Sequence, residues 1–319
     1  MFQHRLVSGD APGRPGAYIG SYVLGKGFIL PPQQAEELIH RDPRNRDVLF
    51  RYLNGEDLNS RPDCSASRWV INFHDWPEEQ AREYPDVFAI VERDVKPERL
   101  KITHSKNARE KWWLYERSRP DLYSKIRKLD RVLVVARVSK TGLPVFVPTG
   151  QVTSEQTVVF ASDRLEDLTW LNSGIHYTWA IARGSSLKGD LRYTPSDIYE
   201  TLPQPSRTTA MATTGAELDR IRRSIMSQRK VGLTRLYNLV HDPSVIDGDI
   251  QALRAAHVEV DHAVVDAYNW QDLNLYHGFT TTRQGMRFSL SQVIQTEVID
   301  RLLELNYAQH TGKADSVLF

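Results

Sequence analysis

The sequence predicts an α+β protein in which a mixed α/β region is followed by a small bundle of helices. Up to residue 205, short apolar runs bounded by Gly and Pro turns alternate with helical patterns. From residue 215 to residue 310, apolar residues recur almost wholly at helical spacing. We therefore divide the 319 residues into an N-terminal arm at 1–16, a mixed region at 17–205 and a helical region at 206–319.

The composition is that of a folded protein without a membrane segment. With 40% hydrophobic and 25% charged residues, the chain is long enough to bury two cores. No apolar run approaches the roughly 20 residues of a membrane span, and no apolar signal segment follows the N-terminus. The single cysteine, Cys64, excludes an internal disulfide and suits a reducing compartment. These features predict a cytoplasmic protein.

The first predicted elements are a strand and a helix. Gly and Pro punctuate residues 1–16, which is typical of an arm. Ala17–Ile19 is expected to form a strand, and Pro32 opens a predicted helix that ends at Arg41. The intervening Gly20–Gly27 approaches a phosphate-binding loop but lacks the Ser or Thr that follows the Lys. We therefore do not predict nucleotide hydrolysis.

Two extended segments follow, at Val48–Tyr52 and Arg68–Phe73, and Asn54-Gly55 between them predicts a turn. Two polar pairs near these strands have catalytic or metal-binding alternatives: Glu56-Asp57 and His74-Asp75. The first pair would point to opposite faces of a strand, and the second has no partner at metal-ligand spacing. We interpret the first as turn solvation or capping and the second as a turn at a strand end.

Helical patterns continue at Glu78–Glu83, again from Pro85, and then from Pro97 to Leu129 in pieces divided at Asn107 and Pro120. These last helices carry most of a basic stretch. Its positive charge is therefore expected on helices and their connecting turns.

The basic stretch runs from Lys96 to Lys140, with 14 Lys or Arg against 5 Asp or Glu, in a chain whose formal charge is +1. Cations neutralise phosphates and aromatic rings stack on sugars and bases, so a nucleic acid fits this stretch. The alternative is an ordinary solvated helical face. The aromatic residues among the charges are Trp112, Trp113, Tyr115 and Tyr123. The predicted phosphate contacts are Lys96, Arg99, Lys101, Lys106, Arg109, Lys111, Arg117 and Arg119.

A β region comes next, with apolar runs at 131–138, 145–147 and 158–160. Polar side chains on its short strands and turns can pair with base edges: Arg or Lys with guanine, Gln with adenine and Glu with cytosine. The alternative is that they only finish a sheet edge. The predicted base readers are Arg137, Ser139, Lys140, Thr141, Gln151, Thr153, Ser154, Glu155 and Gln156.

The helical pattern that begins at Asp163 ends near Leu187, and Pro203–Ser206 indicates a linker. Three apolar stripes then predict the bundle, at 218–225, 250–264 and 294–305. His257 lies in the second stripe, five residues from His262, so the two do not share a helix face as a zinc pair would. We interpret His257 as a core histidine.

Several segments between Ala17 and Leu305 together resemble a known family. In the mixed region they are Tyr52–Asn59, Arg68–Phe73, Val95–Arg99, Arg137–Lys140, Gly184–Leu187 and Asp190–Ser196. In the helical region they are Gly232–Thr234, Tyr237-Asn238, His241–Pro243, Asp266–Tyr268 and Trp270. The first set resembles the target-recognition region of MmeI-like restriction–modification enzymes of type IIL, which combine DNA adenine-N6 methylation with cleavage in one polypeptide. The second is similar to their helical C-terminal tail, and both sets keep the family's order.

The resemblance implies that 17–205 is a DNA target-recognition domain, that 206–319 is a helical C-terminal domain, and that double-stranded DNA is the partner. Such enzymes also carry a Gly-rich loop for S-adenosylmethionine and an Asn-Pro-Pro-Tyr or similar loop for the flipped adenine. We find neither motif in the sequence. We therefore expect no catalytic residue, metal site or cofactor in this chain. S-adenosylmethionine and Mg²⁺ would belong to a methyltransferase or nuclease module, supplied in cis or in trans for phage defence. The alternative is a free-standing metal-dependent nuclease with a dispersed site.

Overall fold

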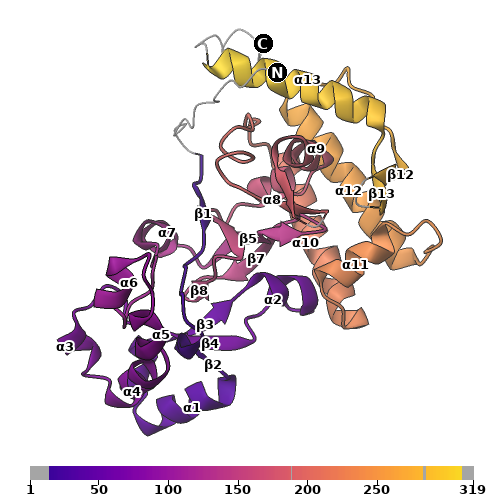
Figure 1. The fold of residues 1–319 in the computed structure, drawn as a ribbon. Helices are drawn as coiled ribbons and strands as arrows, with labels where there is room; N and C mark the ends of the chain where they lie inside the picture. Colours follow the sequence, from indigo (N-terminus) through magenta and orange to yellow (C-terminus); the bar gives the residue numbers. More distant parts are fainter. Residues whose placement is uncertain (1–13, 188, 283–284, 311–319) are drawn as a thin grey trace.

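The computed structural model describes residues 14–187, 189–282 and 285–310 (Figure 1). Most of the predicted N-terminal arm lies outside these residues. The helices are α1 (Pro32–Arg41), α2 (Gly55–Ser60), α3 (Glu78–Ala81), α4 (Pro85–Asp94), α5 (Lys96–Leu100), α6 (Lys106–Glu110), α7 (Pro120–Ile126), α8 (Leu165–Leu171), α9 (Gly174–Arg183), α10 (Thr209–Arg229), α11 (Leu233–Val240), α12 (Gly248–Ala267) and α13 (Gln292–His310), with 3₁₀ helices η1 (Lys26–Phe28) and η2 (Pro43–Asp47).

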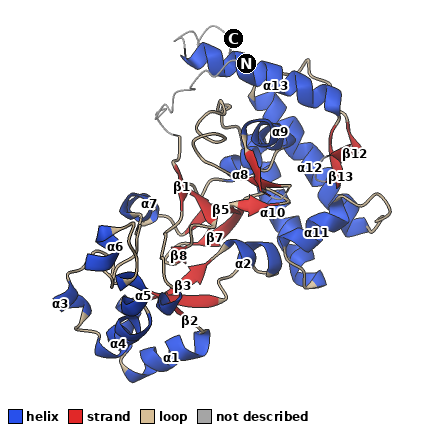
Figure 2. Cartoon of the chain, viewed as in Figure 1, coloured by secondary structure: helices blue, strands red, loops and turns tan. Residues whose placement is uncertain are grey.

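The described strands form four sheets. They are β1 (Ala17–Ile19), β2 (Ile29–Leu30), β3 (Leu49–Leu53), β4 (Arg68–Ile71), β5 (Arg131–Ala136), β6 (Val138–Ser139), β7 (Val145–Pro148), β8 (Val152–Thr153), β9 (Thr157–Phe160), β10 (Ser185–Leu187), β11 (Asp190–Arg192), β12 (His277–Thr282) and β13 (Gly285–Leu290). The sheet orders are β1-β9-β5-β7, β2-β4-β3-β8, β10-β11-β6 and β12-β13. In Figure 2 most strands run through the middle of the molecule with helices on either side, whereas β12 and β13 lie at the right edge. This confirms the predicted α+β class.

One lobe, at the lower left of Figure 1, is built around the sheet β2-β4-β3-β8. Its core joins residues of these strands to η1, α1 and α4, including Phe28, Val70, Ile71 and Val91. Helices α5 and α6 lie on this lobe, and the chain after α6 returns into the same core. The basic stretch therefore starts on this lobe, passes through β5 of the central sheet and ends directly after β6.

The central sheet β1-β9-β5-β7 is buried on both faces. Successive side chains of a strand point to opposite faces. On β5, Leu133 and Val135 accordingly pack with α8, α9 and α13, whereas Val132 and Val134 pack with α2, α7 and α10 to α12. This double burial explains why β5 is a continuous apolar run instead of an alternating one.

The C-terminal helices share both of these cores. Leu218 of α10 and Val260 of α12 belong to the same core as Val132, and Val264 of α12 and Val298 of α13 belong to the same core as Leu133. The predicted boundary at 205 therefore does not separate two cores. Helices α10, α11 and α12 pack on one another, as predicted for a bundle, and they also share the cores of the central sheet.

Three local predictions need correction. Asn54 does not form a hairpin turn: its side chain accepts hydrogen bonds from the N–H groups of Glu56 and Asp57, and Asp57 accepts from Asn54 N–H. This capping box starts α2 and confirms the capping interpretation of Asp57. The helix break predicted at Asn107 lies earlier, because Ser105 caps α6. The hairpin β12–β13 interrupts the predicted helical region.

Candidate nucleic-acid interface

Fewer cations of the basic stretch are exposed than its charge count suggests. Lys101, Lys106, Lys111 and Arg117 are exposed, and Lys96 is half-buried. Lys96, Lys101 and Lys106 pair with Glu92, Glu98 and Glu110 at N–O distances of 2.9, 2.7 and 3.6 Å. Ion pairs at a protein surface are weak, so these ammonium groups can exchange their carboxylate partners for phosphates.

Arg99 does not belong to this surface. Its side chain is 1% exposed, and its Nη2 donates to the carbonyls of Val23 and Leu114, each at 2.9 Å. Burial lowers its pKa, which Glu116 opposes. Arg99 therefore ties the loop before η1 to the segment between α6 and α7, and we remove it from the predicted phosphate contacts.

Arg109 and Arg119 are half-buried and anchored to the backbone. Arg109 Nη1 donates to Ile102 O at 3.1 Å, and Arg119 Nε donates to Gly20 O at 3.3 Å. Burial lowers the pKa of Arg119, and the charge of Arg117 lowers it further. Each guanidinium has further N–H donors besides the one in this bond. Both residues can therefore contribute charge, but from fixed positions.

The aromatic residues of the basic stretch do not offer stacking platforms. Trp112, Trp113 and Tyr115 are 5%, 8% and 6% exposed and belong to the core of the N-terminal lobe. Tyr115 also donates to Ile71 O at 2.7 Å. Tyr123 is half-buried, and its hydroxyl contacts Ser21 Oγ at 2.9 Å. Their role is to hold the segment on the lobe.

The predicted phosphate contacts omit the cations of α7. Lys125, Arg127 and the adjoining Lys128 are exposed, and no described carboxylate forms an ion pair with them. All three belong to the charge excess of the basic stretch, which is the sequence signal that points to them. The exposed charge thus extends from α5 and α6 to α7.

Four of the predicted base readers are buried. Ser139, Thr141, Thr153 and Ser154 are 4%, 5%, 2% and 1% exposed. Ser139 Oγ accepts from the N–H groups of Thr141 and Gly142, and Ser154 Oγ accepts from Gln156 N–H. These side chains close turns of the sheet edge. For these four residues the sheet-edge interpretation applies, and we remove them from the predicted base readers.

The other five retain accessible surface. Lys140 and Gln156 are exposed, and Arg137, Gln151 and Glu155 are half-buried. Gln151 lies apart, since its Nε2 donates to Pro148 O at 2.7 Å and the side chain lines a pocket of about 500 Å³ beside Phe50 and Arg127. Arg137 and Gln156 are neighbours, because Arg137 N–H donates to Gln156 O at 2.7 Å.

The structure adds Arg192 to these residues. Strand β11 pairs with β6 so that Arg192 lies opposite Val138, beside Arg137. Burial lowers the pKa of Arg137, and the positive charges of Arg192 and Arg119 lower it further. The negative charge of Glu155 raises this pKa in opposition. Arg137 Nε is buried without a hydrogen-bond partner in the described structure. We name Arg119, Arg137 and Arg192 the arginine cluster. It brings together side chains that are far apart in the sequence.

Neither a cluster of metal-ligating side chains nor a membrane-spanning helix occurs in the described part of the chain. No group of three or more His, Cys, Asp or Glu residues there is placed to hold a metal ion. No helix among those residues is long and apolar enough to cross a membrane.

The fold is similar to that of a solved DNA-modifying enzyme. The type IIL restriction–modification enzyme MmeI, solved in complex with DNA, superposes with a TM-score of 0.66 at 20% identity, over 97% of this chain and 37% of that chain. This chain thus spans little more than a third of the length of MmeI. The type IIG restriction endonuclease BpuSI gives a TM-score of 0.34 at 14% identity, over 83% of this chain and 31% of that chain. No curated protein matches the sequence.

The similarity to MmeI establishes the fold, and the class of protein follows from the family that the sequence matches. The family described as "MmeI, target recognition domain" matches residues 14–206, more than half of the chain. The chain belongs to this family, which confirms the resemblance seen in the sequence.

Proposed function

We propose that this chain recognises a specific DNA sequence for a restriction–modification system that methylates adenine at N6. Its membership of the target-recognition family and the fold it shares with MmeI support this proposal. The observation that carries it is the arginine cluster next to Gln156 and Glu155. Arginine pairs with the major-groove acceptors of guanine and glutamine pairs with adenine, so this group has the chemistry of base readout.

In this proposal the two sets of exposed polar residues have different tasks. Arg137, Arg192, Glu155 and Gln156 read base edges. The exposed cations of α5 to α7, with Arg109 and Arg117, hold phosphates without reading sequence, and Arg119 is the one member of the arginine cluster that shares this task. Phosphate contacts fix the position of a protein on the duplex, and base contacts determine which sequence is bound.

The direct test is selection of bound duplexes from a random pool by the purified chain, followed by sequencing. We expect one enriched sequence. A chain that binds DNA but enriches no sequence would leave only non-specific binding and would refute the proposed function.

Catalysis is proposed to come from another module, in cis or in trans, that holds S-adenosylmethionine and Mg²⁺. This module and the chain would act together in the cytoplasm, in defence against phage DNA. Titration calorimetry of the chain with S-adenosylmethionine should therefore show no binding, and a tritiated methyl donor should leave DNA unlabelled. Binding with turnover would instead make this chain an enzyme in its own right.

A further inference from the structure

Two adjoining pockets lie where β6, α11 and β13 meet. The outer pocket has a volume of about 290 Å³, and the inner one of about 70 Å³. Thr141, Tyr237, His241 and Arg287 line both. Three segments that carry the family resemblance in the sequence contribute to these pockets: they contain Lys140, Tyr237-Asn238 and His241–Pro243. The proposed base readout uses neither Tyr237-Asn238 nor His241–Pro243. The fold brings all of these residues to the outer pocket.

Arg287 is the unusual residue of this site. It is 6% exposed, and it forms no ion pair with a carboxylate of the described chain. Its Nη2 donates to the carbonyl of Lys140, its guanidinium lies 5.0 Å from the centre of the Tyr177 ring, and its Nε has no partner in the described structure. A buried charge without a counterion is costly, because the protein interior solvates it poorly.

The contact between Arg287 and His241 leaves an additional donor without an acceptor. His241 Nε2 lies 3.2 Å from Arg287 Nη1, and its Nδ1 lies 3.2 Å from Phe288 N. Burial, and then the charge of Arg287, lowers the pKa of His241 to about 3, so the ring is neutral at pH 7. A neutral imidazole has one N–H and one acceptor nitrogen. If Nδ1 accepts from Phe288, Nε2–H faces Arg287 as a second donor; if Nε2 accepts, Phe288 N–H loses its acceptor.

The surroundings of this donor group are also suited to an anion. Lys140, which is exposed, and Asn238 both line the outer pocket. Two carboxylates also line the pockets, and both have hydrogen-bond partners. Asp242 Oδ1 accepts from both the N–H and the hydroxyl of Ser244, and Asp261 accepts from Gly174 N–H at Oδ1 and lies 2.8 Å from His277 Nε2 at Oδ2. One anionic oxygen between Arg287 and His241 would supply the missing acceptor and the missing negative charge.

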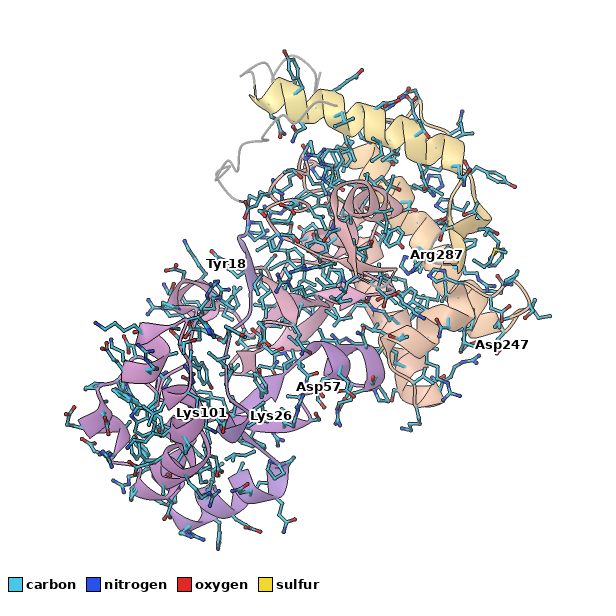
Figure 3. The ribbon with its side chains drawn as sticks, in the orientation of Figure 1. Tyr18, Lys26, Asp57, Lys101, Asp247 and Arg287 are labelled. Atoms are coloured by element: carbon cyan, nitrogen blue, oxygen red, sulfur yellow. The ribbon has the colours of Figure 1, made fainter. Side chains whose placement is uncertain are left out.

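We propose that Lys140, His241 and Arg287 form a binding site for one phosphate group, and that the group is a phosphodiester of the recognised DNA. The second half of this inference rests on the proposed function. Lys140 follows Arg137 by three residues, a span of at most about 10 Å, so the bound phosphate lies close to the bases that Arg137 would read. Lys140 therefore positions the duplex and does not read a base. Figure 3 shows Arg287 far from Lys101, so this site is separate from the cations of α5.

The test neutralises one phosphate at a time. Duplexes of the selected sequence, each with a single uncharged methylphosphonate linkage, are titrated with the chain by fluorescence anisotropy. For the unmodified chain, one linkage near the bases should weaken binding about tenfold, the usual size of one charge-assisted contact. In Lys140→Ala and in Arg287→Lys the same linkage should cost much less, because each substitution has already weakened the interaction with that phosphate.

Arg220→Ala is the matched control. It removes one exposed positive charge of α10, which already pairs with Glu217 at 2.6 Å, and it should keep the methylphosphonate profile of the unmodified chain. Lys140 is exposed, so its substitution should not affect folding; circular dichroism checks both variants. If Lys140→Ala and Arg287→Lys also keep that profile, the inference is wrong.

A second arm separates the pocket from the proposed function. Thermal unfolding is followed in inorganic phosphate and in chloride at equal ionic strength. A stabilisation by phosphate that Lys140→Ala and Arg287→Lys lose supports the phosphate site itself. If the unmodified chain binds no duplex, the proposed function and the DNA half of the inference fail, and this arm alone decides the pocket. No difference between phosphate and chloride in such a chain would overturn the inference completely.

Discussion

Arginine has two opposite roles at the residue scale. Arg99 is buried and uses its hydrogen bonds on the carbonyls of Val23 and Leu114, whereas Arg192 is exposed beside Arg137 on a small sheet. Arg99 holds two segments of the N-terminal lobe together. Arg192 keeps its N–H donors available to a ligand. A charge count gives both residues the same weight, and only their packing separates structural from binding arginines.

Buried histidines should make the folding stability depend on pH. His176 is 1% exposed and contacts Tyr193 Oη at 2.8 Å, and burial lowers its pKa to about 4. In the unfolded chain the pKa returns to about 6.5, so below that pH the unfolded state takes up a proton that the folded state does not. Stability is therefore lost as the pH falls from about 6.5 towards 4. The pKa values of His241 and His257, lowered by burial to about 3, act in the same direction.

The prediction is tested by urea unfolding at pH 7 and pH 5. His176→Gln should reduce the loss of unfolding free energy between these pH values by about 2 kcal/mol relative to the unmodified chain. His40→Gln, at an exposed position of α1, should leave the loss unchanged. An equal loss in the His176 variant and the unmodified chain would contradict the prediction.

At the element scale, the helices α5, α6 and α7 are short pieces held on a scaffold. Buried aromatic side chains after α6 fix the segment in the core, and the hydroxyl of Tyr123 on α7 contacts Ser21. The charges therefore stand on a rigid surface instead of a mobile tail. This placement favours a defined set of phosphate contacts.

The salt dependence of DNA binding should depend on these cations. Changing Lys106 and Lys111 together to Ala should flatten the slope of log affinity against log salt by about 0.9 for each phosphate that the variant no longer neutralises. A control variant with Arg41→Ala and Arg220→Ala removes two exposed positive charges elsewhere and should leave the slope nearly unchanged. Equal slopes for the Lys106/Lys111 variant and the unmodified chain would show that the phosphates do not contact the cations of α6.

Some elements could be predicted from the sequence because their signals are local. Pro32, Pro85 and Pro120 start helices as predicted, and the apolar run of β5 indicated a buried strand. The hairpin β12–β13 could not be predicted from its apolar pattern, since its strands alternate weakly and contain several Thr and Gly residues. The aromatic residues after α6 were misinterpreted for another reason: burial depends on the rest of the lobe, and spacing alone does not show it.

At the scale of the whole molecule, the central sheet depends on helices from the far end of the chain. Val132 packs with residues of α10 to α12, and Leu133 packs with residues of α12 and α13. A boundary at 205 follows a change of pattern in the sequence, but tertiary contacts cross it. The arginine cluster and the pocket of Arg287 are products of the same long-range packing, so only the individual cations were predictable.

Removal of residues 207–319 should therefore prevent cooperative folding. The truncated chain loses the apolar cover on both faces of the central sheet, and it should bind a hydrophobic dye such as ANS and lack a sharp thermal transition. Co-expression with the missing fragment should restore a folded complex. A truncated chain with the near-ultraviolet circular dichroism and cooperative unfolding of the full chain would contradict the shared core.

The central claim is that the surface around the arginine cluster reads bases, and variant selection from a random duplex pool tests it most directly. Arg137→Ala and the double change Glu155→Ala with Gln156→Ala should alter the enriched sequence, with a loss of discrimination of about 1–3 kcal/mol at each affected base pair. Lys101→Ala, an exposed cation of the N-terminal lobe, and Ser139→Ala, a buried turn residue, are the controls and should enrich the parental sequence. If the Arg137 and Glu155/Gln156 variants also enrich the parental sequence and only bind it more weakly, these side chains position DNA and do not read it.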